Sequence, residues 1–195
     1  MSDDGGHAGL GLEIWPATAE RWMDLEALFG ERGACGGCWC MWWRLPRAVF
    51  GRSKGAGTRQ LLEELVGAGG EPGLLAYVDG QVAGWCSVGP REAFPRLATS
   101  RTMRGVDGEG IWSIVCLFVD RRFRRRGLST ALLRSAAEYA VARGATIVEG
   151  HAVVPRKAVV PPIFAFTGLL SAFLAAGFVE VGRPSETRAL MHWRP

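Results

Sequence analysis

The chain has 195 residues, of which 48% are hydrophobic and 22% are charged, and its net charge at pH 7 is +4. This length and composition are those of one globular domain with a substantial core. They exclude a membrane-spanning helix, because no apolar run approaches the ~20 residues that such a helix needs, and a charge this modest does not by itself indicate a nucleic-acid-binding protein.

The N-terminus, residues 1–9, is acidic and glycine-rich. It has neither the basic region nor the apolar region of a secretory signal. We therefore expect a flexible lead-in, followed by a single domain over residues 10–195, in a cytoplasmic protein.

The next part of the chain predicts a strand and two helices. Residues 10–15 are typical of a strand, which Pro16 ends. Residues 19–29 place their large apolar side chains on one face of a helix, and residues 57–66 do the same with three leucines. Glycines follow both segments, and glycine commonly ends a helix.

An antiparallel hairpin is predicted next. The strand-like runs 74–78 and 81–88 are separated by Asp79-Gly80, a pair typical of a type I′ turn. The polar segment 89–110 that follows shows neither a helix period nor a strand period. A connection of this length inside a compact domain is usually functional or partly structured.

The central stretch predicts a strand, a short loop and a helix. Residues 111–119 form an apolar, β-branched run with the length of a buried strand, and arginines crowd the loop at 120–126. An amphipathic helix with leucine or alanine at every fourth position begins at Gly127. Free backbone N–H groups at such a helix start converge on an anion. The residues that would bind a phosphate here are Arg124, Arg125, Arg126, Gly127, Leu128, Ser129 and Thr130.

The C-terminal part predicts a strand, a short helix and a final pair of strands. Residues 146–154 are typical of a strand, and residues 168–176 are typical of a helix that ends at Gly177. The runs 178–181 and 188–193 are expected to pair with each other. The predicted order of elements is β-α-α-β-β-β-α-β-α-β-β, which indicates an α/β (α+β) domain.

The run Arg124-Arg125-Arg126-Gly127-Leu128-Ser129 resembles the R/Q-x-x-G-x-G/A signature of the GNAT superfamily of N-acetyltransferases, although Ser129 stands where glycine or alanine is usual. The predicted order of elements is also that of the GNAT fold. Phe173, followed at four residues by Gly177-Phe178, is similar to a later motif of the family. The resemblance covers nearly the whole chain, and the run from Glu149 to Arg194 resembles a bacterial subgroup without an assigned substrate. It implies a mixed, mostly antiparallel sheet flanked by helices.

The resemblance implies that acetyl-CoA is the cosubstrate and that its acetyl group passes directly to a primary amine of a small substrate. Pantetheine would lie between the central strand and the strand at 146–154, bonded to the backbone of Leu117 and Val119. A backbone N–H near Cys116 or Leu117 would face the thioester oxygen as an oxyanion donor. Homodimers are common in this fold.

The usual acid and base of the family are replaced in this sequence. Phe173 stands at the position of the tyrosine acid and has no proton to donate, and Ser113 stands where some members carry a glutamate base. Among Glu109, Glu149 and His151 we rank Glu149 first as a base, with Ser113 orienting a water. The alternative role of Glu149 is to pair with a local arginine. A non-catalytic acyl-CoA-binding or sensor protein is therefore a second hypothesis.

Three cysteines, Cys35, Cys38 and Cys40, form the pattern C-x2-C-x-C. No second cysteine pair and no nearby histidine completes a four-ligand zinc site. We expect reduced cysteines that pack in the core and bind no metal. A cysteine-centred metal or redox regulator is the third hypothesis.

Tryptophans lie among and after these cysteines. In the GNAT fold the segment between the first two helices commonly borders the acceptor pocket. Trp39, Trp42 and Trp43 would then form an apolar or cation-binding wall for the amine. Packing in the core is the alternative for at least two of them, because each ring buries a large area.

The arginine-rich run 121–126 also has the composition of a nucleic-acid contact. It is short, it lies between a buried strand and a helix start, and no other basic face supports it. Residues 51–58 do not form a P-loop, because the lysine precedes the glycine that it should follow. We expect neither a nucleic-acid partner nor a membrane partner.

Overall fold

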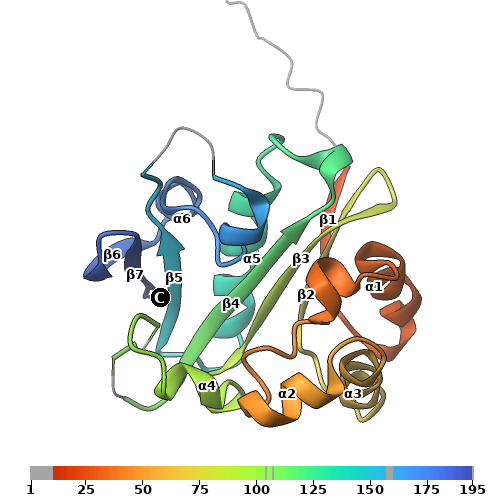
Figure 1. The fold of residues 1–195 in the computed structure, drawn as a ribbon. Coiled ribbons are helices and arrows are strands. Elements are labelled where there is room, and N and C mark those ends of the chain that lie inside the picture. The colour runs from red at the N-terminus through yellow and green to blue at the C-terminus, as the bar shows by residue number, and fades with distance from the viewer. Residues whose placement is uncertain (1–10, 104, 107, 157–159, 195) are drawn as a thin grey trace, which may run out of the picture.

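The computed structural model describes residues 11–103, 105, 106, 108–156 and 160–194. A central twisted sheet carries helices on both faces (Figure 1). The strands are β1 (Leu12–Pro16), β2 (Gly73–Val78), β3 (Gln81–Pro90), β4 (Ile111–Val119), β5 (Ile147–Val153), β6 (Val179–Ser185) and β7 (Arg188–Trp193). The helices are α1 (Trp22–Phe29), α2 (Arg47–Ser53), α3 (Ala56–Gly67), α4 (Pro95–Ala98), α5 (Leu128–Val141) and α6 (Leu170–Ala176).

The strands lie in the order β1-β2-β3-β4-β5-β7-β6. Among the described strands β4 and β5 pair in parallel, and the other neighbours pair antiparallel. The expected α/β class and the mostly antiparallel sheet are therefore confirmed. No helix within the described ranges is long and apolar enough to cross a membrane.

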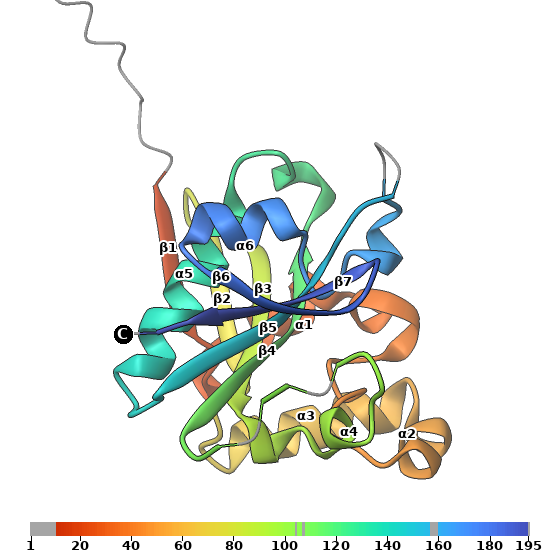
Figure 2. The same ribbon diagram turned by 90° about the vertical axis from the view of Figure 1, so that its left-hand side faces the viewer.

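The sheet separates two helical layers, as Figure 2 shows, with α5 and α6 on one side and α1 to α4 on the other. Helix α5 lies close to the sheet because three of its inward positions, Ala136, Ala137 and Ala140, are fully buried alanines. On the other face the fully buried Trp85 of β3 packs against apolar side chains of α1 and α3. The central strands β3, β4 and β5 are thus largely buried, whereas the edge strands β1 and β6 are mostly exposed.

Local sequence signals were reliable where they were strong. Asp79 and Gly80 have φ of +50° and +75°, which confirms the type I′ turn between β2 and β3. The central strand, loop and helix lie at β4 and α5, close to the expected bounds. Residues 1–9, the expected flexible lead-in, lie outside the described residues.

Several elements differ from the expected ones for physical reasons. The single helix predicted at 19–29 is divided in the structure into a 3-10 turn, η1 (Ala19–Arg21), and helix α1. Helix α2 was not predicted because Phe50 is its one buried residue, so it has no apolar period. Helix α4 is a short turn inside the unassigned segment. Helix α6 begins at Leu170, two residues later than expected, because Gly168 has a left-handed φ of +91°.

The parallel strands β4 and β5 separate after four residue pairs. Their pairing runs from Ile111–Ile147 to Ile114–Gly150 and then stops. At the same point β4 carries a β-bulge, because Ile114 and Cys116 face successive residues of β3 and leave Val115 extra. The predicted separation of the two strands is therefore present, and it opens toward the start of α5 (Figure 1).

Candidate active site

The loop after β4 presents the start of α5 to open space. Gly127 has a left-handed φ of +78°, and a Cβ at this position would meet no atom within 4 Å. Ala131 donates its backbone N–H to the Gly127 carbonyl at 3.1 Å. The N–H groups of the residues between them, Leu128, Ser129 and Thr130, precede this first helical bond and are free to bind a ligand. This is the geometry that binds a phosphate.

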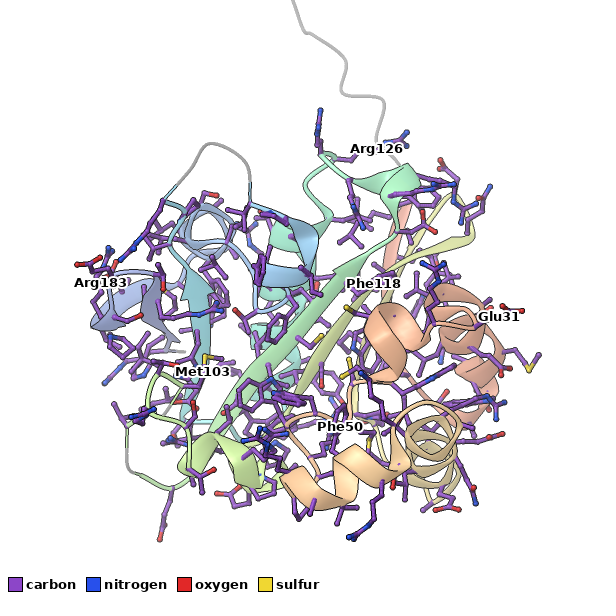
Figure 3. All side chains as sticks on the ribbon, in the orientation of Figure 1. Glu31, Phe50, Met103, Phe118, Arg126 and Arg183 are labelled. Atoms are coloured by element: carbon purple, nitrogen blue, oxygen red, sulfur yellow. The ribbon has the colours of Figure 1, made fainter. Side chains whose placement is uncertain are left out.

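Exposed arginines surround this helix start. Arg124, Arg125 and Arg126 are all exposed. The Nε of Arg124 donates to the Val119 carbonyl at 3.0 Å, which fixes that side chain at the end of β4. Figure 3 shows Arg126 reaching away from the body of the molecule. The structure thus brings the seven predicted phosphate-binding residues to one place.

A hollow of about 570 Å³ lies beside the start of α5. It is bordered by Gly127 and Thr130 and extends to Leu12 and Ile14 of β1. A pyrophosphate group therefore fits the residues present, because open space, free N–H groups and positive charge coincide.

Below the opening, Ser113 of β4 and Glu149 of β5 are paired across the sheet. The Oγ of Ser113 donates to Oε1 of Glu149 at 2.7 Å, and the Nε of Arg91 lies 3.5 Å from the same oxygen. Glu149 is fully buried, and its Oε2 has no hydrogen-bond partner among the described residues. Burial raises the pKa of Glu149, against the opposing effects of Ser113 and Arg91. Such a carboxylate can accept a proton from a nearby group.

Two neighbours of this carboxylate were not found from the sequence. Gly105 closes over it, since a Cβ at Gly105 would overlap Oε2 of Glu149. His192 of β7 is paired directly with Glu149 and is 2% exposed. Burial lowers the pKa of His192, and Arg194 and Arg91 lower it further, which favours the neutral form of the ring. The proximity of His192 to Glu149 follows from the order of the strands, which places β7 beside β5, and it has no signal in the local sequence.

Phe173, at the position that resembles the family's acid, is a core residue. Its side chain is fully buried and meets Phe178 edge to face at 5.0 Å between ring centroids. The ring fills the space left by the missing side chains of Gly150 and Gly168. Phe173 therefore packs against the two separated strands, and its side chain has no proton to donate to a leaving thiolate.

The three tryptophans lie in different environments. Trp39 is 3% exposed and packs against Phe29 at 5.6 Å in the core between the sheet, α1 and α3. Trp42 is partly exposed, with the Arg96 guanidinium 3.7 Å from its ring centroid. Trp43 packs in a separate cluster with Val115 of β4. Trp43 thus lies beside the bulged Val115 of β4, and the structure favours a packing role for Trp39.

Replacing Trp39 with alanine is expected to lower the free energy of unfolding by about 3–5 kcal/mol, because it leaves a large cavity in the core. Chemical denaturation measures this change. Trp42→Ala is the matched control, and its loss should be clearly smaller because the ring is partly exposed. Equal losses for the two variants would argue against Trp39 as a core residue.

Two of the three motif cysteines, Cys38 and Cys40, lie in environments that raise their pKa. The Sγ of Cys40 accepts a hydrogen bond from Nε1 of Trp85 at 2.9 Å, and Cys35 is exposed. Burial raises the pKa of Cys38 to about 11. A hydrogen-bond contact with Cys116, together with burial, raises the pKa of Cys40 well above its ordinary value. The part of the chain that the structure describes holds no cluster of three or more His, Cys, Asp or Glu residues suited to a metal ion.

Comparison with known proteins decides the family. The model of the acetyltransferase (GNAT) family matches residues 39–160, which include the helix start at Gly127 and the carboxylate of Glu149. The chain belongs to the GNAT acetyltransferase family. Members of this family use acetyl-CoA, as the resemblance implied. A search of curated proteins finds no significant match.

Solved structures of GNAT proteins share the fold at low sequence identity. An acetyltransferase from Listeria monocytogenes is 12% identical with a TM-score of 0.56, over 96% of this chain and 97% of that one. The PaiA N-acetyltransferase from Thermoplasma acidophilum, in complex with coenzyme A, is 11% identical with a TM-score of 0.54, over 95% and 100%. A ribosomal-protein-alanine N-acetyltransferase from Brucella melitensis is 18% identical with a TM-score of 0.53, over 94% and 99%.

Proposed function

We propose that this GNAT protein transfers the acetyl group of acetyl-CoA directly to a primary amine of a small substrate. The observation that carries the proposal is the start of α5, where Gly127, three free N–H groups and three exposed arginines surround open space. The GNAT relative in complex with coenzyme A supports the same ligand for this chain. When bound, acetyl-CoA supplies an activated acetyl thioester.

Cofactor binding, charge stabilisation and proton transfer would be carried out by residues at different positions along β4. Residues 124–130 would hold the pyrophosphate at the open end of the strand. The N–H of Leu117 would stabilise negative charge on the thioester oxygen. Four residues further down, about 13 Å along the strand, Glu149 would accept the proton of the amine through a chain of waters that Ser113 helps to orient, because this distance is too long for direct transfer. Trp43, beside Val115, would line the acceptor side.

Ser113 lowers the basicity of Glu149, so the direction in which the pKa of Glu149 moves when Ser113 is replaced can be predicted. The hydrogen bond from Ser113 lowers the pKa of Glu149. In Ser113→Ala that pKa should rise, and the low-pH limb of the rate profile should move to higher pH, with a loss of roughly tenfold near neutral pH. The measurement is the pH dependence of kcat for an amine that the wild type acetylates. An unmoved limb would mean that Ser113 does not act through Glu149.

A non-catalytic acyl-CoA sensor is the second candidate function. It is favoured by Phe173, which has no proton to give to the leaving thiolate. The two candidates differ in one assay, in which the protein is incubated with acetyl-CoA and a panel of small amines and the products are identified by mass spectrometry. Amine-dependent acetylation that is lost in Gly127→Glu supports the transferase. Saturable acetyl-CoA binding without any product supports the sensor.

A further inference from the structure

The opening between β4 and β5 is bridged by the chain itself. Residues 165–169, here called the closing segment, lie between the two separated strands (Figure 1). The N–H of Leu117 on β4 donates to the Phe166 carbonyl at 2.6 Å, and the N–H of Val153 on β5 donates to the Gly168 carbonyl at 2.8 Å. The closing segment thus satisfies one inward N–H on each strand.

The inner part of the closing segment is closely fitted. Thr167 is fully buried, and its Oγ1 accepts a hydrogen bond from Nη1 of Arg188 on β7 at 2.9 Å. Gly168 has a φ of +91°, and a Cβ there would lie 2.8 Å from side-chain carbons of both Leu117 and Phe173. Only glycine therefore allows the backbone to approach β4 this closely.

The preceding turn, η5 (Pro162–Phe164), is much less buried. The side chains of Ile163 and Phe164 are 58% and 62% exposed. Because these two large apolar side chains are exposed to solvent, few packing contacts stabilise the position of η5. A withdrawal of the closing segment would therefore begin at η5.

We propose that the closing segment occupies the proposed pantetheine channel in this conformation and must withdraw before acetyl-CoA can bind productively. This inference rests on the proposed function, which assigns the Leu117 N–H to the thioester oxygen. An amide N–H carries one hydrogen, so it cannot serve the Phe166 carbonyl and the thioester oxygen fully at once. The contact is autoinhibitory, because the observed affinity is reduced by the fraction of molecules in which the channel is open.

Gly168→Ala tests the closed state directly, since alanine is strained at this φ and would collide with Leu117 and Phe173. The variant should open the channel, and the apparent Kd for acetyl-CoA should fall by up to about tenfold. Gly69→Ala is the matched control. Gly69 has a similar φ of +83°, no atom lies within 4 Å of its Cβ position, and it lies between α3 and β2. Weaker binding in Gly168→Ala alone would overturn the proposal.

Hydrogen exchange on the wild-type protein gives an independent test that needs no variant. With saturating acetyl-CoA, amides at the start of α5 should exchange more slowly, and the amide of Val153 should exchange faster because it loses the Gly168 carbonyl. If α5 is protected while Val153 is unchanged or slower, the closing segment stays in place and this inference is wrong, although the proposed function stands. If acetyl-CoA protects neither region, the proposed function fails as well.

Discussion

Replacing Gly127 with glutamate is expected to weaken acetyl-CoA binding strongly, with a stability cost of about 1–2 kcal/mol because Gly127 has a left-handed φ of +78°. The new carboxylate would lie at the helix start where the pyrophosphate is proposed to bind. Two like charges about 4 Å apart repel by about 4 kcal/mol at an effective dielectric constant of 20. Solvent weakens this repulsion at an exposed site, so a loss of roughly hundredfold in affinity is expected.

The readout for Gly127→Glu is thermal stabilisation by the ligand, because a ligand that binds the folded state raises the melting temperature. Acetyl-CoA should raise the Tm of the wild type and should not raise that of Gly127→Glu. Gly144→Glu is the matched control. Gly144 lies just after α5, has a φ of +87°, and has no atom within 4 Å of its Cβ position. Equal stabilisation of both variants by acetyl-CoA would contradict the proposed phosphate site.

Replacing Glu149 with glutamine should remove the base and little else. The side-chain amide oxygen can still accept the hydrogen bond from Ser113, so the shape of the site is kept. The loss of general-base catalysis typically lowers kcat by about 10²- to 10⁴-fold. The KM for acetyl-CoA should change little, because Glu149 lies about 13 Å from the proposed thioester site along the strand.

The pH profile identifies Glu149 more directly than the rate at one pH. A base works only when it is deprotonated, so the wild-type rate should fall as the pH falls through the raised pKa of Glu149. That low-pH limb should be absent in Glu149→Gln. Glu109→Gln is the control, since Glu109 is exposed near the same end of β4. A limb that persists in Glu149→Gln would assign the titration to another group.

The sequence predicted what local patterns determine. The apolar run of β4, the glycine at the start of α5 and the Asp79-Gly80 turn each act over a few residues, and each is in its expected place. Together they were enough to predict the strand, loop and helix start that form the proposed phosphate site.

The rest of the site depends on contacts between residues that are distant in the chain. Arg91 and Gly105 come from a segment without a periodic pattern, and they meet Glu149 only in the folded sheet. His192 reaches Glu149 because β7 inserts between β5 and β6. The bond from Leu117 to Phe166 spans 49 residues and has no signature in the sequence.

The most direct measurement is a calorimetric titration of the wild-type protein with acetyl-CoA and, separately, with CoA. Both ligands carry the pyrophosphate that the start of α5 is proposed to bind. The account therefore predicts that both bind, with one molecule per chain and with similar affinity. Failure of both ligands to bind would contradict the phosphate site at Gly127 and, with it, the proposed acetyl transfer.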